Sequence, residues 1–290
     1  MLVTPIETIH ASQRTAFGRT SLSAADAGVP ALGYVIDYQD LADALAARLD
    51  CAGIRIDAEY DRTAELVVHA EGSGDYTSEK RYAQTAVVAL VSAEPRAGST
   101  AYERFTAEGP LALLPLGGRF GMVWAASSAR ASALLAMPEA QFLDALQDTF
   151  GRRAGRFRAV TGRSAAPLAL RVRRVRAGNR EAYAGNSAQT LHPVAGQGLN
   201  LGLRDAWDLV GSIRGAPDPG AAAVLERYAR RRTLDAFATI RVTDLLAVLF
   251  LETGFAARAA RGAALCALDA CAPARRFFAR RMIYGPSALP

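Results

Sequence analysis

A glycine-rich loop that leads into a helix is the strongest fold signal in the chain. It reads Tyr183-Ala184-Gly185-Asn186-Ser187-Ala188-Gln189-Thr190-Leu191-His192-Pro193-Val194-Ala195-Gly196-Gln197-Gly198-Leu199-Asn200-Leu201-Gly202-Leu203-Arg204-Asp205-Ala206. The small residues Gly185-Asn186 follow a short predicted strand and allow a ligand to approach the backbone closely. The segment from His192 to Gly198 is too rich in Gly and Pro for regular structure. A loop of this kind either binds a ligand or only turns the chain, and the spacing leaves both interpretations open.

A helix is predicted directly after this loop, beginning near Gly198 or Leu199. Its apolar residues share one face and are Leu199, Leu203, Ala206, Val210 and Ile213. Arg204 and Asp208 are four residues apart, so they are expected to form an exposed ion pair. A helix N-terminus behind glycines offers N–H groups and the positive end of the helix dipole. Such a position favours an anion or a developing negative charge.

Upstream of the loop, alternating and apolar stretches predict a series of strands. They cover residues 3–10, 33–38, 64–70, 86–91, 111–116 and 121–125. The strand at 64–70 is expected to be buried and to end in the glycine turn Glu71-Gly72-Ser73-Gly74. Turn signals at Gly109-Pro110 and Gly117-Gly118 separate the middle strands, which favours an antiparallel sheet there.

Helices are predicted on both sides of these strands. Leucines repeat every four residues from Leu41 to Leu49, which predicts a helix with Asp40 as its N-cap. A second helix is predicted to start at Pro138, to end before Gly151 and to bury the face that carries Phe142, Leu146 and Phe150. From residue 220 onward the sequence reads as helical, with breaks at Gly254 and Pro273.

Composition excludes several classes of protein. The chain has 290 residues, of which 51% are hydrophobic and 21% charged, as in a globular protein of two domains or one large one. The apolar run Leu245–Leu251 has 7 residues, whereas a membrane helix needs about 20. This run is therefore predicted to be a packed helix, although a prenylated substrate would make an apolar, membrane-facing region useful. No secretory signal follows Met1, so the expected location is cytoplasmic, with a peripheral association at the inner membrane as the variant.

The net charge of +6 belongs to the C-terminal part of the chain. Residues 222 to 290 hold 11 arginines and 5 acidic residues. The arginines cluster at Arg230-Arg231-Arg232, Arg275-Arg276 and Arg280-Arg281. These clusters are either solvated helix faces or a basic surface that meets anionic lipid or a partner protein. Nucleic acid is disfavoured because no recognised binding motif accompanies the charge.

The cysteines and histidines predict no metal site. Cys51, Cys266 and Cys271 form no CxxC pair and have no zinc spacing with the three histidines. An odd number of thiols fits a reduced compartment. His10 and His69 lie in apolar strand sequence and are expected to be satisfied, buried or half-buried histidines.

The loop and helix at Gly185 to Asp205 resemble the second flavin-binding motif of the flavin-dependent aromatic hydroxylases, in particular the branch that acts in ubiquinone biosynthesis. The resemblance covers about residues 3 to 235. It continues in Thr4 to Gln13, Gly33-Tyr34-Val35-Ile36, Glu103-Arg104-Phe105-Thr106, Gly109 to Leu116 and Val123-Trp124.

This resemblance implies a mixed α/β fold like that of para-hydroxybenzoate hydroxylase. In such a fold a flavin domain is interleaved with an antiparallel-sheet substrate domain. The implied substrate-domain segments are 1–35 and 76–165, and the flavin-domain segments are 36–75 and 166–215. Helices at 216–290 complete the chain.

The resemblance also implies an FAD-dependent monooxygenase. NAD(P)H would reduce the flavin, and oxygen would add to give a C4a-hydroperoxide that hydroxylates a prenylated phenol. The implied FAD contacts are Gly185, Asn186, His192, Pro193, Gly196, Gln197, Gly198, Leu199 and Asn200, and Glu71 is either a further contact or a turn residue. The strand residues Phe105, Leu113, Pro115 and Trp124 either line the phenol pocket or form plain core. His192 is expected to be part of the flavin wall rather than an acid or base, and no residue is identified as the group that deprotonates the phenol.

Two departures from the family pattern leave alternatives open. The family's middle Ala-Asp-Gly motif is Ala70-Glu71-Gly72 here, and no GxGxxG fingerprint follows an N-terminal strand. One hypothesis is that translation starts upstream of Met1. The other is a catalytically silent paralogue that binds a quinone-biosynthesis complex or the membrane surface.

Overall fold

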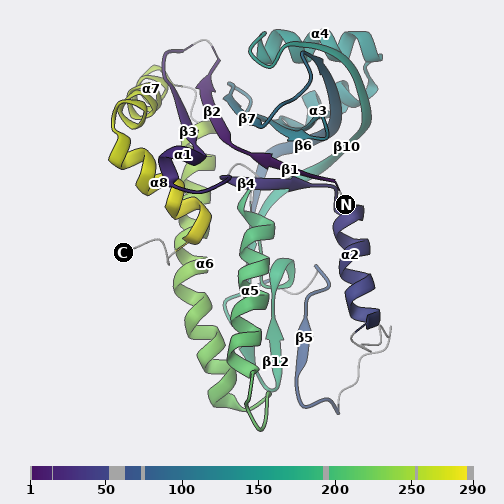
Figure 1. Cartoon of the computed structure of the whole chain (residues 1–290), viewed down its shortest axis with the longest axis vertical. Helices are drawn as coiled ribbons and strands as arrows, with labels where there is room; N and C mark the ends of the chain where they lie inside the picture. Colours follow the sequence, from purple (N-terminus) through teal and green to yellow (C-terminus); the bar gives the residue numbers. More distant parts are fainter. Residues whose placement is uncertain are drawn as a thin grey trace. The chain divides into compact units, whose positions relative to one another are not determined.

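Helices and strands in the computed structural model form two units, each assembled from distant segments of the chain (Figure 1). The structure describes residues 2–14, 16–51, 63–72, 76–191, 196–251 and 254–285. The larger unit comprises Met1–Arg55, Ala83–Pro167 and Leu249–Pro290, and the smaller unit comprises Ile56–Tyr82 and Leu168–Val248. The predicted mixed α/β class is confirmed.

The larger unit is built on a long sheet with the strand order β10-β6-β9-β8-β7-β2-β3, and the short strand β13 (Gln189–Thr190) extends this sheet beside β10. Its strands are β2 (Thr8–Gln13), β3 (Arg19–Ser23), β6 (Ser78–Glu94), β7 (Thr100–Phe105), β8 (Pro110–Leu116), β9 (Arg119–Ala126) and β10 (Arg156–Val172). The pairs β6–β9, β9–β8, β8–β7 and β2–β3 are antiparallel, which confirms the prediction for the middle of the chain. The pair β2–β7 is parallel, so residues 8–13 join the sheet beside residues that follow them by about 90 positions.

The turn between β8 and β9 explains why two glycines stand together. Leu116 pairs with Arg119, so the connection has only the two residues Gly117 and Gly118. Their φ angles are +58° and +79°. A two-residue hairpin turn of this kind needs a left-handed backbone at both positions, which glycine adopts without steric cost.

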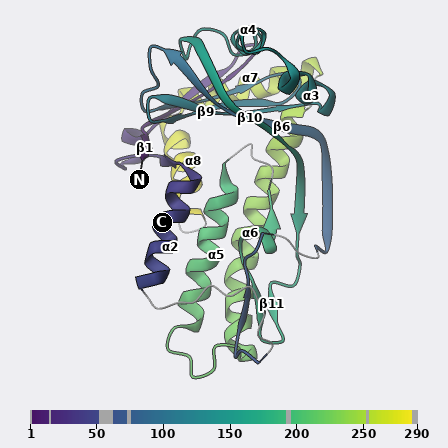
Figure 2. The ribbon, with the colours of Figure 1, turned by 90° about the vertical axis from the view of Figure 1, so that its right-hand side faces the viewer.

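The core of the larger unit lies between the sheet and two helices, α3 (Ser128–Ala136) and α4 (Glu139–Phe150) (Figure 2). Phe142, Leu146 and Phe150 are buried, as predicted from their spacing. They meet strand residues whose side chains point to the same face, among them Leu111, Leu113, Met122 and Trp124. Pro138 is the N-cap of α4 and Gly151 is its C-cap, one residue from the predicted start and at the predicted end.

Further elements of the larger unit are short strands and helices. β1 (Val3–Ile6) pairs antiparallel with β4 (Gly33–Ile36), and α1 (Ala24–Ala27), α7 (Phe255–Ala270) and α8 (Ala272–Tyr284) complete it. α2 (Tyr38–Cys51) begins two residues before the predicted N-cap Asp40. The reason is that Asp37, rather than Asp40, accepts a first-turn hydrogen bond, from the Gln39 amide at 2.9 Å.

The smaller unit combines a three-stranded sheet with two helices. Its elements are β5 (Val67–His69), β11 (Ala177–Gly178), β12 (Glu181–Tyr183), the 3-10 turn η1 (Gly185–Ser187), β13 (Gln189–Thr190), α5 (Gln197–Ile213) and most of α6 (Ala222–Leu251). β12 pairs parallel with β5 and antiparallel with β11. The helices α5 and α6 lie side by side in both ribbon views and share a small core of Leu209, Leu225, Tyr228 and Ala182. The strand at β5 was expected to be buried, but its residues are half-buried or exposed because only the β12 edge is paired in the described residues.

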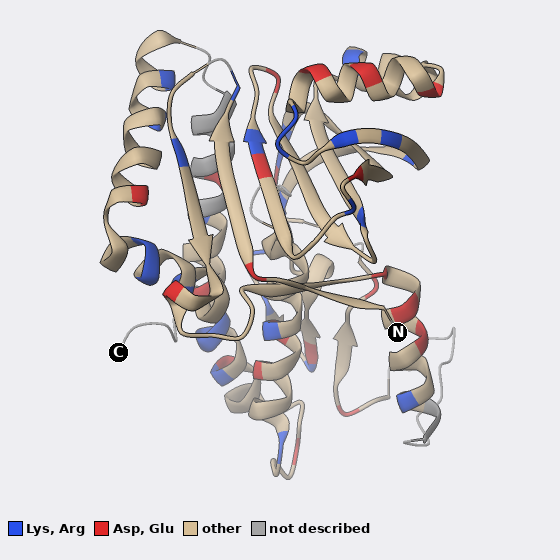
Figure 3. Cartoon of the chain, turned by 45° about the horizontal axis from the view of Figure 1, so that its top comes forward, with Lys and Arg blue, Asp and Glu red and all other residues tan. Residues whose placement is uncertain are grey.

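The predicted helical C-terminal region is confirmed. Gly254 is the N-cap of α7, Pro273 lies in the first turn of α8, and the apolar run Leu245–Leu251 continues α6. Within the described ranges, no helix has both the length and the apolar character that a membrane span requires. Basic and acidic positions are interspersed along α5 and α6 rather than gathered on one basic face (Figure 3).

Replacement of the buried leucine of α4 tests the core. Leu146 has no exposed surface, so Leu146→Ala should lower the free energy of unfolding by about 3 kcal/mol, through lost burial and the cavity left behind. Leu45 in α2 is 55% exposed, so Leu45→Ala should change it by less than about 1 kcal/mol. Urea unfolding followed by circular dichroism measures both, and equal losses would contradict this description of the core.

Candidate functional site

Two loops of the smaller unit meet because two distant strands are parallel neighbours. In the β5–β12 pair, Val67 lies opposite Glu181 and His69 opposite Tyr183. The residues after β5, Ala70-Glu71-Gly72, and those after β12, Ala184-Gly185-Asn186, therefore leave the same edge of the sheet. Ligands of open α/β sheets bind at the carboxyl ends of parallel strands. This arrangement places two of the predicted cofactor segments together.

The turn η1 is held against the loop after β5 by polar contacts. The Gly72 amide donates to the Ser187 hydroxyl at 3.2 Å, and the Tyr76 hydroxyl donates to the Asn186 carbonyl oxygen at 2.8 Å. Gly185 has φ +59°, and an added Cβ at this position would find open space. Gly185 is therefore required by its left-handed backbone and not by crowding. The side chain of Asn186 is exposed and available to a ligand.

Helix α5 presents its N-terminus without a side-chain cap. Its N-cap, Gly196, has φ +59°, and no side-chain hydrogen bond caps the helix. Gly198, Leu199 and Asn200 in the first turn are exposed, and an added Cβ at Gly196 or Gly198 would meet nothing within 4 Å. The first-turn amides of a 17-residue helix carry the positive end of its dipole. The predicted anion-favouring helix start thus exists at Gln197, one residue before the predicted Gly198.

Helix α5 is packed directly on the turn. A Cβ at Gly202 would lie 3.2 Å from the Cα of Gly185, so the helix can approach this closely only with glycine there. The helix N-terminus, the turn η1 and the loop after β5 are consequently parts of one site. The predicted contacts Glu71, Gly185, Asn186, Gly196, Gln197, Gly198, Leu199 and Asn200 belong to these three elements. The predicted contacts His192 and Pro193 lie outside the described residues.

A stacked pair of rings lies beneath the strand ends. The His69 ring stacks on Tyr183, with centroids 4.6 Å apart and planes 10° from parallel, and the Arg173 guanidinium lies 3.9 Å from the Tyr183 ring centroid. His69 also lies between two carboxylates, 3.6 Å from Glu71 and 3.8 Å from Glu181. His69 is therefore half-buried and partnered, as predicted, and it holds Glu71 at the base of the loop.

The apolar face predicted for α5 is mostly exposed. Leu199, Leu203 and Val210 are 58%, 56% and 57% exposed, and Trp207 on the same stripe is 81% exposed. The buried face instead carries Gln197, Leu201, Asp205, Leu209 and Ser212. Because three of these five are polar, apolar periodicity identified the wrong side of the helix.

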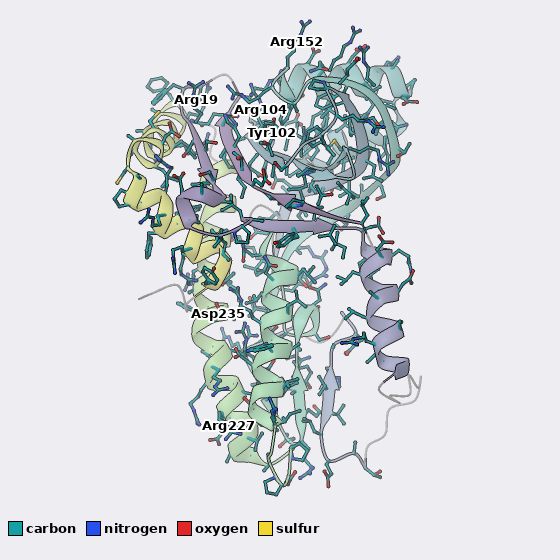
Figure 4. The ribbon with its side chains drawn as sticks, viewed as in Figure 1. Arg19, Tyr102, Arg104, Arg152, Arg227 and Asp235 are labelled. Atoms are coloured by element: carbon teal, nitrogen blue, oxygen red, sulfur yellow. The ribbon has the colours of Figure 1, made fainter. Side chains whose placement is uncertain are left out.

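Two ionic predictions are corrected in the same region. Arg204 pairs with Asp235 at 3.1 Å and Asp208 with Arg232 at 2.9 Å, so each has a partner on α6, and both side chains are half-buried rather than exposed. Arg232 was assigned to a basic surface cluster but is 2% exposed, whereas its neighbour Arg230 is 71% exposed in its side chain. Asp235 lies on α6 beside α5, where Figure 4 labels it. A charge at position 205, between Leu201 and Leu209 at helical spacing, is the sequence signal that would have revealed this network.

The four predicted pocket residues are all buried in the larger unit. Leu113 and Trp124 belong to the core against α3 and α4, while Phe105 on β7 and Pro115 on β8 are buried in their strands. Their burial fits the plain-core interpretation for Leu113 and Trp124. A role for any of the four in a phenol pocket stays a prediction.

Glu103 on β7 was not predicted as an acid or base, but its carboxyl group is buried. Its Oε1 atom is buried without a hydrogen-bond partner among the described residues, and its cross-strand neighbours are Ala11 and Ala112. Burial raises the pKa of Glu103 to about 8. On the same strand Tyr102 contacts His10, which is 8% exposed, and the pKa of His10 is lowered by burial and by nearby Arg153.

The fold and the site define a nucleotide-binding α/β protein, in which a helix N-terminus and the ends of two parallel strands belong to one site. A sequence profile described as an FAD binding domain matches residues 58–243, well over half of the chain. The chain belongs to the FAD binding domain family.

Several curated relatives carry ubiquinone names. The chain is 35% identical over 250 residues to the ubiquinone hydroxylase UbiL of Rhodospirillum rubrum, covering 81% of this chain and 58% of the relative. It is 34% identical over 189 residues to the 3-demethoxyubiquinol 3-hydroxylase of Escherichia coli, covering 60% and 48%. It is 31% identical over 248 residues to the mitochondrial ubiquinone biosynthesis monooxygenase COQ6 of Caenorhabditis elegans, covering 70% and 54%. The chain thus spans about half the length of these relatives.

Solved structures share the fold at low sequence identity. The p-nitrophenol 4-monooxygenase PnpA of Pseudomonas putida matches 96% of this chain and 81% of its own, with a TM-score of 0.75 and 14% identity. A point variant of HpxO from Klebsiella pneumoniae, complexed with FAD, matches 99% of this chain and 84% of its own, with a TM-score of 0.74 and 14% identity.

The residues at the site fit FAD. An isoalloxazine ring has a polar pyrimidine edge that becomes negative on reduction, and the first-turn amides of α5 are donors of the right charge for it. The open space around Gly185, Gly196 and Gly198 lets a planar ring and its chain approach the backbone. Among the described residues, by contrast, no cluster of His, Cys, Asp and Glu is arranged to bind a metal ion.

Replacing Glu103 tests its buried carboxyl. Its pKa of about 8 in the folded protein lies above the value in an unfolded chain. The protonated Glu103 carboxyl therefore contributes its full share of the unfolding free energy below about pH 4.5, and this share is lost as the pH rises to about 8. Between pH 5.5 and 8, the unfolding free energy of Glu103→Gln should gain about 3 kcal/mol relative to the native chain.

The control is Glu108→Gln, which replaces an exposed carboxylate on the neighbouring turn. Its difference from the native chain should not change over the same pH range. Urea unfolding measures the free energy of unfolding at each pH. If this free energy changes with pH in the same way for the native chain and for Glu103→Gln, Glu103 is ionised at neutral pH.

The exposed stripe of α5 is tested by fluorescence. The chain has two tryptophans, of which Trp124 is 1% exposed and Trp207 is 81% exposed. Trp207→Phe should shift the emission to shorter wavelength and remove most of the quenching by acrylamide. Trp124→Phe should do the opposite, and a Trp207 that acrylamide cannot reach would mean that the stripe is covered in solution.

Proposed function

We propose that the chain is an FAD-dependent monooxygenase that hydroxylates a prenylated phenol in ubiquinone biosynthesis. The observation that carries this proposal is the close packing of α5 on the turn η1 at Gly202 and Gly185. This packing brings an uncapped helix N-terminus to the ends of two parallel strands. The ubiquinone relatives support the choice of substrate class, and 2-polyprenyl-6-methoxyphenol is the first substrate to test.

Each part of the site has a defined task in this proposal. The amides from Gly196 to Asn200 bind the pyrimidine edge of the flavin and stabilise negative charge there. Asn186, exposed on the turn, hydrogen-bonds the ribityl chain or phosphates. Glu71, held by His69 at 3.6 Å, lies at the loop after β5 and accepts hydrogen bonds from the cofactor. The bound FAD supplies the redox chemistry with NAD(P)H and oxygen, whereas the protein orients the cofactor and excludes water.

A second candidate function is binding without catalysis, as an assembly partner of a quinone-biosynthesis complex or at a membrane surface. The exposed stripe of Leu199, Leu203, Trp207 and Val210 favours it, because an apolar helix face in water is typical of an interaction surface. Exposed arginines of α8, such as Arg276 and Arg280, would suit anionic lipid at the membrane periphery.

A pair of glycine variants tests the flavin site. Gly185 and Gly215 both have left-handed backbones, with φ +59° and +73°, and both have open space around an added Cβ. Gly185→Ala and Gly215→Ala should therefore strain the backbone by the same amount, about 1 to 2 kcal/mol. Equilibrium dialysis with FAD should show about tenfold weaker binding for Gly185→Ala and a change below about twofold for Gly215→Ala. If Gly185→Ala and Gly215→Ala bind FAD with equal affinity, the turn at Gly185 is not part of the FAD site.

Activity separates the two candidate functions. Oxygen consumption that depends on both NAD(P)H and a prenylated phenol would exclude the non-catalytic role. FAD binding without such turnover, together with sedimentation of the chain with anionic vesicles or a quinone-biosynthesis complex, would favour the binding role. A chain that takes up no FAD and shows no yellow flavin absorbance would contradict the first proposal.

A further inference from the structure

One carboxylate in α5 is bonded to the backbone of the turn η1. Asp205 lies two turns into the helix and has no exposed surface. Its Oδ2 atom accepts from the Gly185 amide at 3.0 Å and from the Gln189 side-chain amide at 2.7 Å. The Gln189 amide also donates to the Gly185 carbonyl oxygen at 3.2 Å. Both polar backbone groups of Gly185 are thus fixed by bonds that converge on Asp205.

The other oxygen of this carboxylate is bonded to an arginine of α6. The Nε atom of Arg232 donates to Asp205 Oδ1 at 2.6 Å, and its Nη1 atom donates to Asp208 at 2.9 Å and to Asp235 at 2.8 Å. Burial lowers the pKa of Arg232, but the carboxylates of Asp205, Asp208 and Asp235 raise it by more, so the net shift is upward. Arg232 therefore stays charged, and its bonds are charge-assisted.

The ion pair matters to the turn because both partners are buried. A carboxylate without exposed surface stays ionised only while cations and donors compensate for its lost hydration. If Arg232 is removed, Asp205 loses the charge-assisted donor on its Oδ1 atom, and its bonds to Gly185 and Gln189 must rearrange.

We propose that Arg232 is a positioning residue of the flavin site, acting through Asp205 on the turn Gly185–Ser187. The inference rests on the proposed function, because the turn matters only if it receives the cofactor. Asp205 does more than pack the helix, because it accepts a hydrogen bond from the backbone of the turn itself. It also belongs to α5, the helix whose first turn is part of the proposed flavin site. The pair thereby sets the position of Asn186 relative to the amides at Gly196 to Asn200.

The test compares Arg232→Gln with Arg230→Gln. Both remove one arginine from the same turn of α6, but the Arg230 side chain is 71% exposed and pairs with the exposed Glu226 of the same helix. In the full chain without cofactor, hydrogen exchange at the Gly185 amide should be at least about tenfold faster in Arg232→Gln and unchanged in Arg230→Gln. FAD affinity, measured by quenching of flavin fluorescence, should fall by at least about tenfold in Arg232→Gln only.

Two further variants keep the proposal testable if Arg232→Gln does not fold. Arg232→Lys keeps the charge but offers one nitrogen for three carboxylates, so it should restore part of the protection at Gly185 and part of the FAD affinity. Asp205→Asn keeps the shape but places an NH₂ group against a donor in either orientation of the amide, so it should resemble Arg232→Gln in both measurements.

The outcomes separate the two proposals. A folded Arg232→Gln with native exchange at Gly185 and native FAD affinity overturns the positioning role, as does a loss of stability alone with native FAD affinity. Faster exchange in Arg232→Gln, in a chain whose native form binds no FAD, supports the control of the turn and overturns the proposed function. Faster exchange together with weaker FAD binding supports both.

Discussion

The smaller unit depends on the parallel pairing of β5 with β12. These strands are only three residues long and lie more than 110 positions apart in the sequence. Their register, Val67 with Glu181 and His69 with Tyr183, brings two loops to one edge of the sheet. Parallel pairing requires a long connection, and here the chain forms much of the larger unit between the two strands. The site is therefore local in space and distant in sequence.

One group of buried charges in the smaller unit joins its two helices. Arg232, Asp205 and Asp235 are each at most 4% exposed, and they join α5 to α6 where an apolar contact would serve as well for packing. Replacing such a network with well-packed apolar residues is often neutral or stabilising. Apolar residues cannot accept a directed hydrogen bond, whereas Asp205 accepts one from the Gly185 backbone amide. The network thus fits a demand for geometry more than a demand for stability.

Sequence alone predicted the parts of the fold in which apolar residues follow the true period of an element. Phe142, Leu146 and Phe150 identified the buried face of α4 because these side chains pack into the hydrophobic core. The same rule failed on α5, where Asp205 and Ser212 are buried and Leu203 is exposed. The loop motif led to Gly185 and Gly196, whose left-handed backbones are local properties. Arg232 was missed because its partner at position 205 lies on a different helix, and sequence spacing carries no information on such a pair.

The two glycines where α5 meets the turn are constrained for different reasons, and natural variation should reflect this. At Gly185 the sign of φ is decisive and the space is open, so Asn or Asp, which adopt left-handed conformations most readily, are the acceptable replacements. At Gly202 the backbone is ordinary helix, and the neighbouring Cα at 3.2 Å is the obstacle. Only alanine could enter there, after α5 moves by a few tenths of an ångström. Evolutionary drift at position 202 thus requires a compensating shift of a helix, whereas drift at position 185 requires only a change of side chain.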